Sequence, residues 1–290
     1  MTQQPPAGPA DPPDGPEPPD LPDRVALTYG ELDLSTVPAF AGGFINFGYW
    51  AGLPGPAGRP LTEADRVRSE QDLYRLVLGT FDRPQGRTAL EVGCGRGLGS
   101  ALALREFGLG KVLGMDAHPD QIARAREANA GLLAASSDSS GRLEFLRGAA
   151  ERIPLPDGCV DCLFSVEAAQ HFRELTGFAR EAARVLRPGG RLALTTFFAR
   201  THAAARVLPT MLPPYADGLD VPHVVDEVAT TLSAAGLREV RVRSIGDGVW
   251  ESYDRYMAQQ PELRDEWPRR YLTAYETGLL DYYLLTGGAD

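Results

Sequence analysis

A short apolar run, a glycine-rich turn and the beginning of a helix follow one another in Thr88-Ala-Leu-Glu-Val-Gly-Cys-Gly-Arg-Gly97 and the residues after it. Ala89 to Val92 is apolar except for one acid, and Leu98 to Leu104 is rich in helix formers. Glycine at alternate positions of the turn permits positive φ and lets a ligand approach bare backbone. The stretch therefore predicts the first half of a βαβ unit with a ligand at its turn.

The second apolar run, Lys111 to Asp116, ends in an acid about twenty residues further on, where a ribose-binding carboxylate belongs. The turn differs from the dinucleotide fingerprint, because Leu98 stands where that pattern requires Gly or Ala. An acid, Glu91, instead lies on the strand before the turn. These residues predict a nucleoside ligand and do not require a pyrophosphate.

Strand and helix patterns alternate through most of the chain. Helices are expected over 62–81, 120–130, 174–186 and 224–235, and 131–141 reads as a loop. Further strands are expected over 143–147, 161–166, 191–197, 238–245 and 279–286. This alternation predicts an α/β fold with a doubly wound, mostly parallel sheet that is covered on both faces.

Composition divides the chain into three parts. Residues 1–23 are rich in Pro, Gly, Asp and Glu, so we expect a disordered tail. Residues 24–61 contain aromatic residues interrupted by glycines and are expected to form a cover, which could pack on a neighbouring subunit of a homo-oligomer. Residues 62–290 are expected to form the main domain, with aromatic and helical lid insertions at about 198–223 and 246–278.

Composition also limits the partners. The chain has 290 residues, 43% of them hydrophobic, and a net charge of −10, which argues against nucleic acid and anionic membranes. We expect no membrane span and no secretory signal. The odd cysteine count predicts a reducing, cytoplasmic environment. Cys159 and Cys162 lack a second pair, so no metal site is expected.

Taken together, these features resemble the class I S-adenosylmethionine-dependent methyltransferases over residues 62–286. The resemblance implies a Rossmann-like sheet of seven strands with an antiparallel last strand between strands five and six. The segments that carry it are Leu90–Gly97 (cofactor loop), Met115-Asp116 with Gln121 (ribose), Gly148–Pro156 (adenine), Phe164–His171, Val185–Gly190 and Leu280–Leu284. Ala149 departs from the family, which often has an acid there for the adenine amino group.

The segment Phe44-Ile-Asn-Phe-Gly-Tyr-Trp50 is similar to one in a subset of that family. This subset includes natural-product tailoring methyltransferases and relatives of sterol and tocopherol methyltransferases. Its members methylate O, C or occasionally N atoms of small molecules. The resemblance implies S-adenosylmethionine as cofactor, S-adenosylhomocysteine as product and a small-molecule substrate.

The predicted cofactor site combines bare backbone with one carboxylate. Asp116 is expected to accept from the ribose hydroxyls, and Glu91 to act through water or to hold the loop. Tyr49 and Trp50 either close over the cofactor or only pack in an aromatic cluster. Gln71 either contacts the methionyl carboxylate of the cofactor or lies on a solvated helix face. The full set is Tyr49, Gln71, Glu91, Gly93, Cys94, Gly95, Gly97, Asp116, Ala117, Gln121, Ala150, Glu151 and Val166.

His171 and Glu167 are the predicted catalytic residues, because they lie just beyond the fourth strand's carboxyl end. His171 is a candidate general base for the acceptor's proton, or a histidine that only packs. Glu167 either orients His171, binds a ligand or lies in water. The remaining histidines have no metal-type spacing. Candidate residues for the substrate wall are Tyr215, Trp250, Tyr253 and Tyr256.

A base at His171 favours O-methylation of a secondary-metabolite acceptor. The runner-up is C-methylation of an activated carbon or prenyl-like substrate. A nicotinamide-dependent oxidoreductase and a non-catalytic cofactor-binding protein stay open as further candidates, because fold alone does not decide between them.

Overall fold

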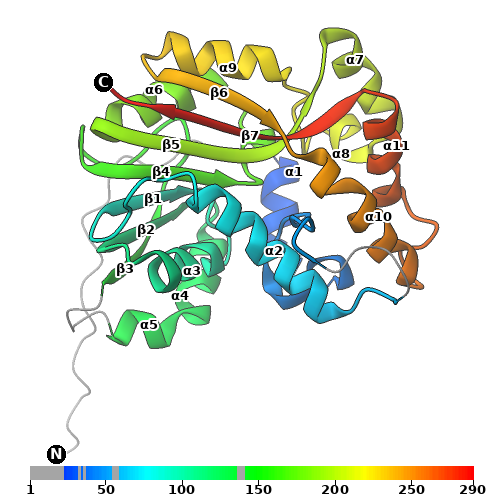
Figure 1. The fold of residues 1–290 in the computed structure, drawn as a ribbon, viewed down its shortest axis with the longest axis horizontal. Coiled ribbons are helices and arrows are strands. Elements are labelled where there is room, and N and C mark those ends of the chain that lie inside the picture. The colour runs from blue at the N-terminus through cyan, green and yellow to red at the C-terminus, as the bar shows by residue number, and fades with distance from the viewer. Residues whose placement is uncertain (1–22, 32–33, 35–36, 54–58, 136–140) are drawn as a thin grey trace, which may run out of the picture.

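The computed structural model describes residues 23–31, 34, 37–53, 59–135 and 141–290. The predicted tail falls almost wholly outside these residues. The centre of the molecule is one seven-stranded sheet in the order β3-β2-β1-β4-β5-β7-β6 (Figure 1). Its strands are β1 (Thr88–Val92), β2 (Lys111–Asp116), β3 (Arg142–Arg147), β4 (Val160–Val166), β5 (Leu186–Ala199), β6 (Arg238–Ser244) and β7 (Leu280–Gly288).

The strands from β3 to β5 pair in parallel, and β7 pairs antiparallel with both β5 and β6. Successive residues of a strand face opposite sides of the sheet, so the central strands are buried from both. In β4, for example, Cys162 and Phe164 join one buried apolar cluster and Leu163 joins the other. The predicted doubly wound fold with an antiparallel last strand is therefore confirmed.

Helices cover both faces of the sheet (Figure 1). The apolar residues of α2 (Glu63–Leu78), α3 (Leu98–Phe107) and α4 (Pro119–Ala128) join the first cluster. Those of α6 (Leu175–Val185) and α9 (Val225–Ala234) join the second. Thr62 begins α2 with a capping box, in which Thr62 and Asp65 exchange side-chain-to-backbone hydrogen bonds.

Two local predictions are wrong. The expected loop at 131–141 begins as a short helix, α5 (Ala130–Ala135), because its alanines and leucines favour helix over the single glycine. The strand expected over 191–197 is longer, because β5 begins at Leu186 and pairs with β4 across a register shift. Helix α6 accordingly ends at Val185.

The two insertions form helices at one end of the sheet (Figure 1). The first contains α7 (His202–Met211) and α8 (Pro213–Ala216), and the second α10 (Trp250–Gln259) and α11 (Arg270–Glu276). Their aromatic rings pack together under the cover segment. Phe47 stacks on Phe197 with ring centroids 5.4 Å apart, and Trp250 stacks on Tyr271 at 5.4 Å. The helical and aromatic character predicted for the insertions is confirmed, and their role as a lid stays a prediction.

A buried arginine fastens the cover segment to α2. Arg66, which is fully buried, donates to the backbone oxygens of Ala39 (2.9 Å) and Asn46. It also forms an ion pair with Glu70 (3.0 Å), which is equally buried. Burial raises the pKa of Glu70 to about 9, although the charge of Arg66 opposes that shift. The cover therefore packs on its own chain, and its Phe44, Phe47 and Trp50 side chains are buried.

Candidate active site

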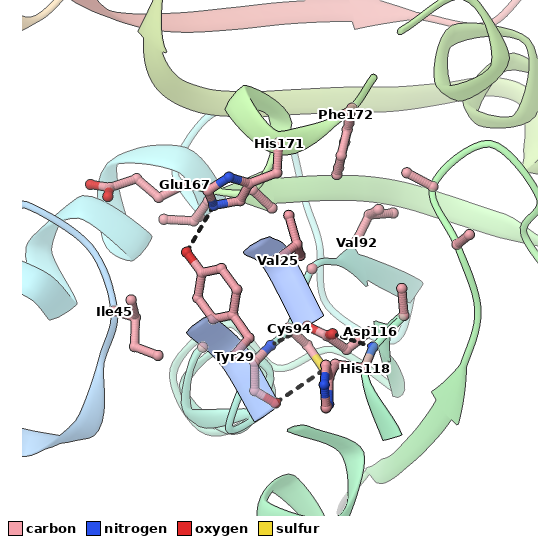
Figure 2. Close-up of a pocket in the computed structure, with 18 of the residues that line it drawn as sticks. Val25, Tyr29, Ile45, Val92, Cys94, Asp116, His118, Glu167, His171 and Phe172 are labelled. Carbon is pink, nitrogen blue, oxygen red and sulfur yellow. Dashed lines mark hydrogen bonds between the residues drawn. The ribbon is translucent and has the colours of Figure 1, made fainter. Parts of the chain in front are cut away.

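A cavity of about 360 Å³ opens at the carboxyl ends of β1, β2 and β4 (Figure 2). Ligands of open α/β sheets bind at this edge, and small-molecule sites measure about 300–1,000 Å³. The cavity is therefore large enough for one nucleoside-sized ligand. The predicted residues that line it are Gly93, Cys94, Gly95, Asp116, Ala117, Ala150, Glu151, Val166, Glu167 and His171.

The turn after β1 has no room for side chains. Gly93 has φ 78°, and a Cβ there would come within 2.3 Å of the Cβ of Ala168. Gly97 has φ 69°, and its Cβ would come within 2.3 Å of the ring of Phe145. The amides of Gly93 and Cys94 donate to the carbonyl of Met115 at 2.8 and 2.9 Å, which fastens the turn to β2.

Asp116 is held by the backbone with its carboxylate in the cavity wall. One oxygen accepts from the amide of Gly95 and the other from the amide of His118, each at 2.9 Å. Burial raises the pKa of Asp116, and these two hydrogen bonds oppose the shift. Because a carboxylate oxygen can accept more than one hydrogen bond, both oxygens can also receive the two hydroxyls of a ribose.

Glu91 lies beneath the turn rather than in the cavity wall. Its carboxylate is fully buried and accepts from the hydroxyls of Tyr74 (2.9 Å) and Ser100. Burial raises the pKa of Glu91 to about 8, against the effect of these hydrogen bonds. The side chain thus links α2, β1 and α3, which agrees with a role in holding the loop.

Four more of the predicted cofactor residues lie outside the cavity lining. Gly97 serves the turn through its backbone, as described above. The Gln71 side chain accepts from Arg75 on α2 at 3.3 Å. Tyr49 lies against Gly248. The amide of Gln121 donates to the backbone oxygen of Tyr29 at 2.7 Å. These positions give no support to direct cofactor contacts by Tyr49 and Gln71.

His171 ends a short 3-10 turn after β4, with its two ring nitrogens in different surroundings. Nδ1 lies 3.0 Å from the carbonyl oxygen of Leu219 and 3.1 Å from the carboxylate of Asp220. Both partners are acceptors, which assigns the proton of the neutral ring to Nδ1. Nε2 is then an acceptor on the cavity side, where the hydroxyl of Tyr29 lies at 2.8 Å (Figure 2) and the side-chain amide of Gln170 at 3.1 Å.

The environment of His171 favours its protonated form. Burial alone lowers the pKa of this imidazole. The hydrogen bond and charge of Asp220, with smaller contributions from the Leu219 carbonyl and Glu167, outweigh burial and raise the pKa above its usual value. The arrangement is that of a base whose conjugate acid is stabilised by a buried carboxylate.

Glu167 does not orient His171, because its carboxylate turns away from the imidazole (Figure 2). It accepts from the amide of Phe47 and the hydroxyl of Tyr282, and so links the cover to β7. Burial raises the pKa of Glu167 to about 7 against these hydrogen bonds, and its backbone has φ 47°. The orienting carboxylate belongs to Asp220.

Within the described residues, no three His, Cys, Asp or Glu side chains are grouped in a way that could hold a metal ion. The three cysteines are all free thiols. Among the helices of the described ranges, none is both long and apolar enough to span a membrane.

Comparison with known proteins gives concordant results. Residues 90–194 match the family described as methyltransferase domain. The erythromycin 3''-O-methyltransferase of Saccharopolyspora erythraea is 29% identical over 78% of this chain and 71% of its own length. The fatty-acid O-methyltransferase of Mycolicibacterium smegmatis is 36% identical over 51% of this chain. The chain thus spans only about half the length of that relative.

Among solved structures, geranyl diphosphate C-methyltransferase from Streptomyces coelicolor A3(2) superposes with a TM-score of 0.72. The superposition covers 92% of this chain and 97% of the C-methyltransferase chain. The two sequences are 18% identical, so the likeness concerns the fold. The match in the cofactor-loop region, the relatives and the fold agree with the sequence prediction. Residues 90–194 thus contain a methyltransferase domain, and the relatives and the fold support the predicted resemblance of the chain to class I S-adenosylmethionine-dependent methyltransferases.

Proposed function

We propose that the chain transfers a methyl group from S-adenosylmethionine to a hydroxyl oxygen of a small, secondary-metabolite-type molecule and releases S-adenosylhomocysteine. The observation that carries this proposal is the orientation of His171. Its Nε2 faces the cofactor cavity, while Asp220 and the Leu219 carbonyl hold Nδ1. Both relatives described above are named as O-methyltransferases.

The cavity residues fit S-adenosylmethionine. Asp116 would receive the ribose hydroxyls, the backbone of Gly93 to Gly95 would face the amino-acid part, and Ala149 to Glu151 would border the adenine. When bound, the cofactor supplies a methyl group already activated on a sulfonium. The protein therefore has to hold donor and acceptor in line and exclude water.

The residues on the acceptor side can take up the proton that O-methylation releases. An acceptor hydroxyl placed at Nε2 of His171 would donate its hydrogen bond there and pass its proton to the imidazole. Asp220 would then stabilise the resulting imidazolium through Nδ1.

C-methylation is the second candidate, favoured by the aromatic rings behind Glu167 and by the structural likeness to a C-methyltransferase. A carboxylate beside stacked rings could stabilise a cation that forms on carbon. Glu167, however, is already engaged with Phe47 and Tyr282, and the stacked rings are not among the residues that line the cavity.

The direct test is turnover. The chain would be incubated with S-adenosylmethionine and hydroxyl acceptors of the kinds that the relatives' names indicate, a fatty acid and a macrolide glycoside, beside geranyl diphosphate. Formation of S-adenosylhomocysteine and of a methyl ether or ester is expected. A carbon-methylated product instead would establish the second candidate, and cofactor binding without turnover of any acceptor would leave a non-catalytic protein.

Asp116→Ala is expected to weaken cofactor binding by about 1–3 kcal/mol, through loss of charge-assisted hydrogen bonds to the ribose. Calorimetric titration with S-adenosylhomocysteine measures this loss. Asp226→Ala, which removes an exposed acid on α9, is the control and should bind normally. Equal affinities of both variants would contradict the assignment of Asp116.

Asp220→Asn is expected to move the acidic limb of the kcat/KM profile to lower pH. His171 must be neutral to accept a proton, so activity is lost as the pH falls through the pKa of its imidazole. Because that pKa is raised, the loss occurs at a higher pH than for an ordinary histidine. Without the charge of Asp220, burial lowers that pKa again. We also expect kcat at the optimum to fall about tenfold or more. A purely structural role for Asp220 would change kcat but leave the inflection in place.

The proposal also covers the organisation and surroundings of the protein. We propose a cover at 24–61 and a catalytic domain at 62–290, because Arg66 joins the two through buried hydrogen bonds. Free cysteines are consistent with a reducing compartment such as the cytoplasm. The net charge of −10 supports the exclusion of nucleic acid. The buried cover aromatics give no reason to add a partner subunit.

A further inference from the structure

The beginning of the described chain lies against the cofactor cavity. Residues 23–31, which we call the gate segment, form α1 (Asp23–Ala26) and one turn of π-helix (Leu27–Glu31). The side chains of Val25 and Tyr29 line the cavity (Figure 2). A segment remote in sequence from the cofactor loop therefore closes part of the site.

A few polar contacts hold the gate segment in place. The backbone oxygen of Tyr29 accepts from Gln121 (2.7 Å) and Arg124 (2.9 Å), and Arg124 also donates to the oxygen of Gly30 (2.6 Å). At the other end, Arg24 pairs with Asp217 at the surface. The gate segment thus bridges α4, on the ribose side, and the loop that carries Asp220. Such partly exposed contacts can open without disturbing the core.

Tyr29 occupies the position that the proposed reaction requires for the acceptor. Its hydroxyl donates to Nε2 of His171 at 2.8 Å, and the two rings meet edge to face with centroids 5.3 Å apart. The side-chain amide of Gln170 also lies 3.1 Å from this nitrogen, so its single lone pair has no place for a second hydroxyl. The 360 Å³ cavity also has room for little beyond the cofactor. An acceptor can therefore reach His171 only when Tyr29 withdraws.

We propose that the gate segment opens to admit the acceptor, and that Tyr29 is a placeholder for an acceptor whose reacting hydroxyl is carried on a planar ring, a phenol or ring enol. This inference rests on the proposed function, because it takes Nε2 of His171 as the acceptor's partner. The wall near His171 contains Val25, Ile45 and Phe172, which suit the faces of such a ring.

Gly30 provides a means of opening the gate. A Cβ at this residue would lie 2.5 Å from Nε2 and 2.7 Å from Cε1 of His118. His118 is buried, and its Nδ1 caps α4 by accepting from the amide of Asp120 at 3.1 Å, so the ring cannot simply turn aside. Gly131 in α5 is a matched control, because a Cβ there meets nothing within 4 Å.

The first experiment measures release of S-adenosylhomocysteine by stopped-flow fluorescence. Gly30→Ala and Arg124→Ala are each expected to release it about tenfold faster than the parent chain, the equivalent of one ordinary hydrogen bond. Gly131→Ala should keep the parent rate. The two test variants act at different atoms, and circular dichroism reports whether each is folded. Parent-like release from both folded variants would overturn the gate.

The second experiment tests the placeholder with p-cresol, the side chain of tyrosine as a free molecule. Tyr29→Gly is expected to bind p-cresol saturably and to shift the imidazole NMR signals of His171, whereas the parent chain should not. Adding His171→Ala should weaken this binding, and 4-methylcyclohexanol should bind Tyr29→Gly less well than p-cresol. Absence of p-cresol binding, or equal binding by the parent, would overturn the inference. Neither experiment requires methyl transfer, so a chain without turnover would contradict the proposed function alone.

Discussion

His171→Ala is expected to lower kcat by about 10²- to 10⁴-fold, the usual contribution of a positioned general base. Cofactor affinity should remain close to that of the parent chain. The binding residues Gly95 and Asp116 are held by their own backbone hydrogen bonds, and none of these involves His171. The variant should therefore lose turnover at saturating S-adenosylmethionine.

The measurement combines steady-state kinetics with titration of S-adenosylhomocysteine. His202→Ala is the control, because that side chain is exposed and its neighbour is the exposed Glu227. His171→Gln adds a second readout, since it can accept a hydrogen bond but cannot act as a base at neutral pH. Full activity in either His171 variant would remove this histidine from the chemistry.

Arg66→Ala is expected to reduce the free energy of unfolding by about 2–6 kcal/mol, because two buried backbone oxygens lose their donor at about 1–3 kcal/mol each. The substitution leaves the carboxyl of Glu70 and the backbone oxygens of Ala39 and Asn46 without their donor. The cover segment should loosen together with α2. Urea denaturation followed by circular dichroism measures the change.

Arg68→Ala, on the exposed side of the same helix, should change stability little, since surface ion pairs contribute only about 0–1 kcal/mol. The double variant Arg66→Met with Glu70→Met should recover part of the loss, because it replaces both buried polar side chains by apolar ones. If Arg66→Ala were as stable as Arg68→Ala, the proposed fastening of the cover would be wrong.

Much of the fold was predictable because its signals are local. The apolar strands, the capping box at Thr62 and the glycine turn at 93–97 each encode their own conformation. The boundaries of β5 and α5 were not predictable in the same way. At Pro188 to Gly190, hydrogen bonds of Gly189 and Gly190 with Ala289 carry β5 through a sequence that reads as a turn, where its register with β4 shifts. In α5, alanine and leucine outweigh residues typical of loops.

The cofactor side of the site was more predictable than the acceptor side. Asp116 and the glycine turn adjoin along two neighbouring strands, so their meeting follows from the strand order. Asp220 lies far beyond His171 in an insertion, and Tyr29 lies in the cover. Neither is part of a periodic pattern, and only tertiary packing brings them to the imidazole. An acid in an irregular stretch of 198–223 was the one available signal for Asp220.

The position of β7 has a consequence for how the chain matures. In the sheet of the described residues β6 pairs with β7 alone, and β7 lies between β5 and β6. During synthesis the strands from β3 to β5 can assemble as they emerge, while β6 has no neighbour in the sheet until residues 280–288 leave the ribosome. Insertion of the last strand therefore closes the sheet, and Tyr282 then brings its hydroxyl to Glu167 beneath the cover. Completion of the acceptor side thus depends on the insertion of β7.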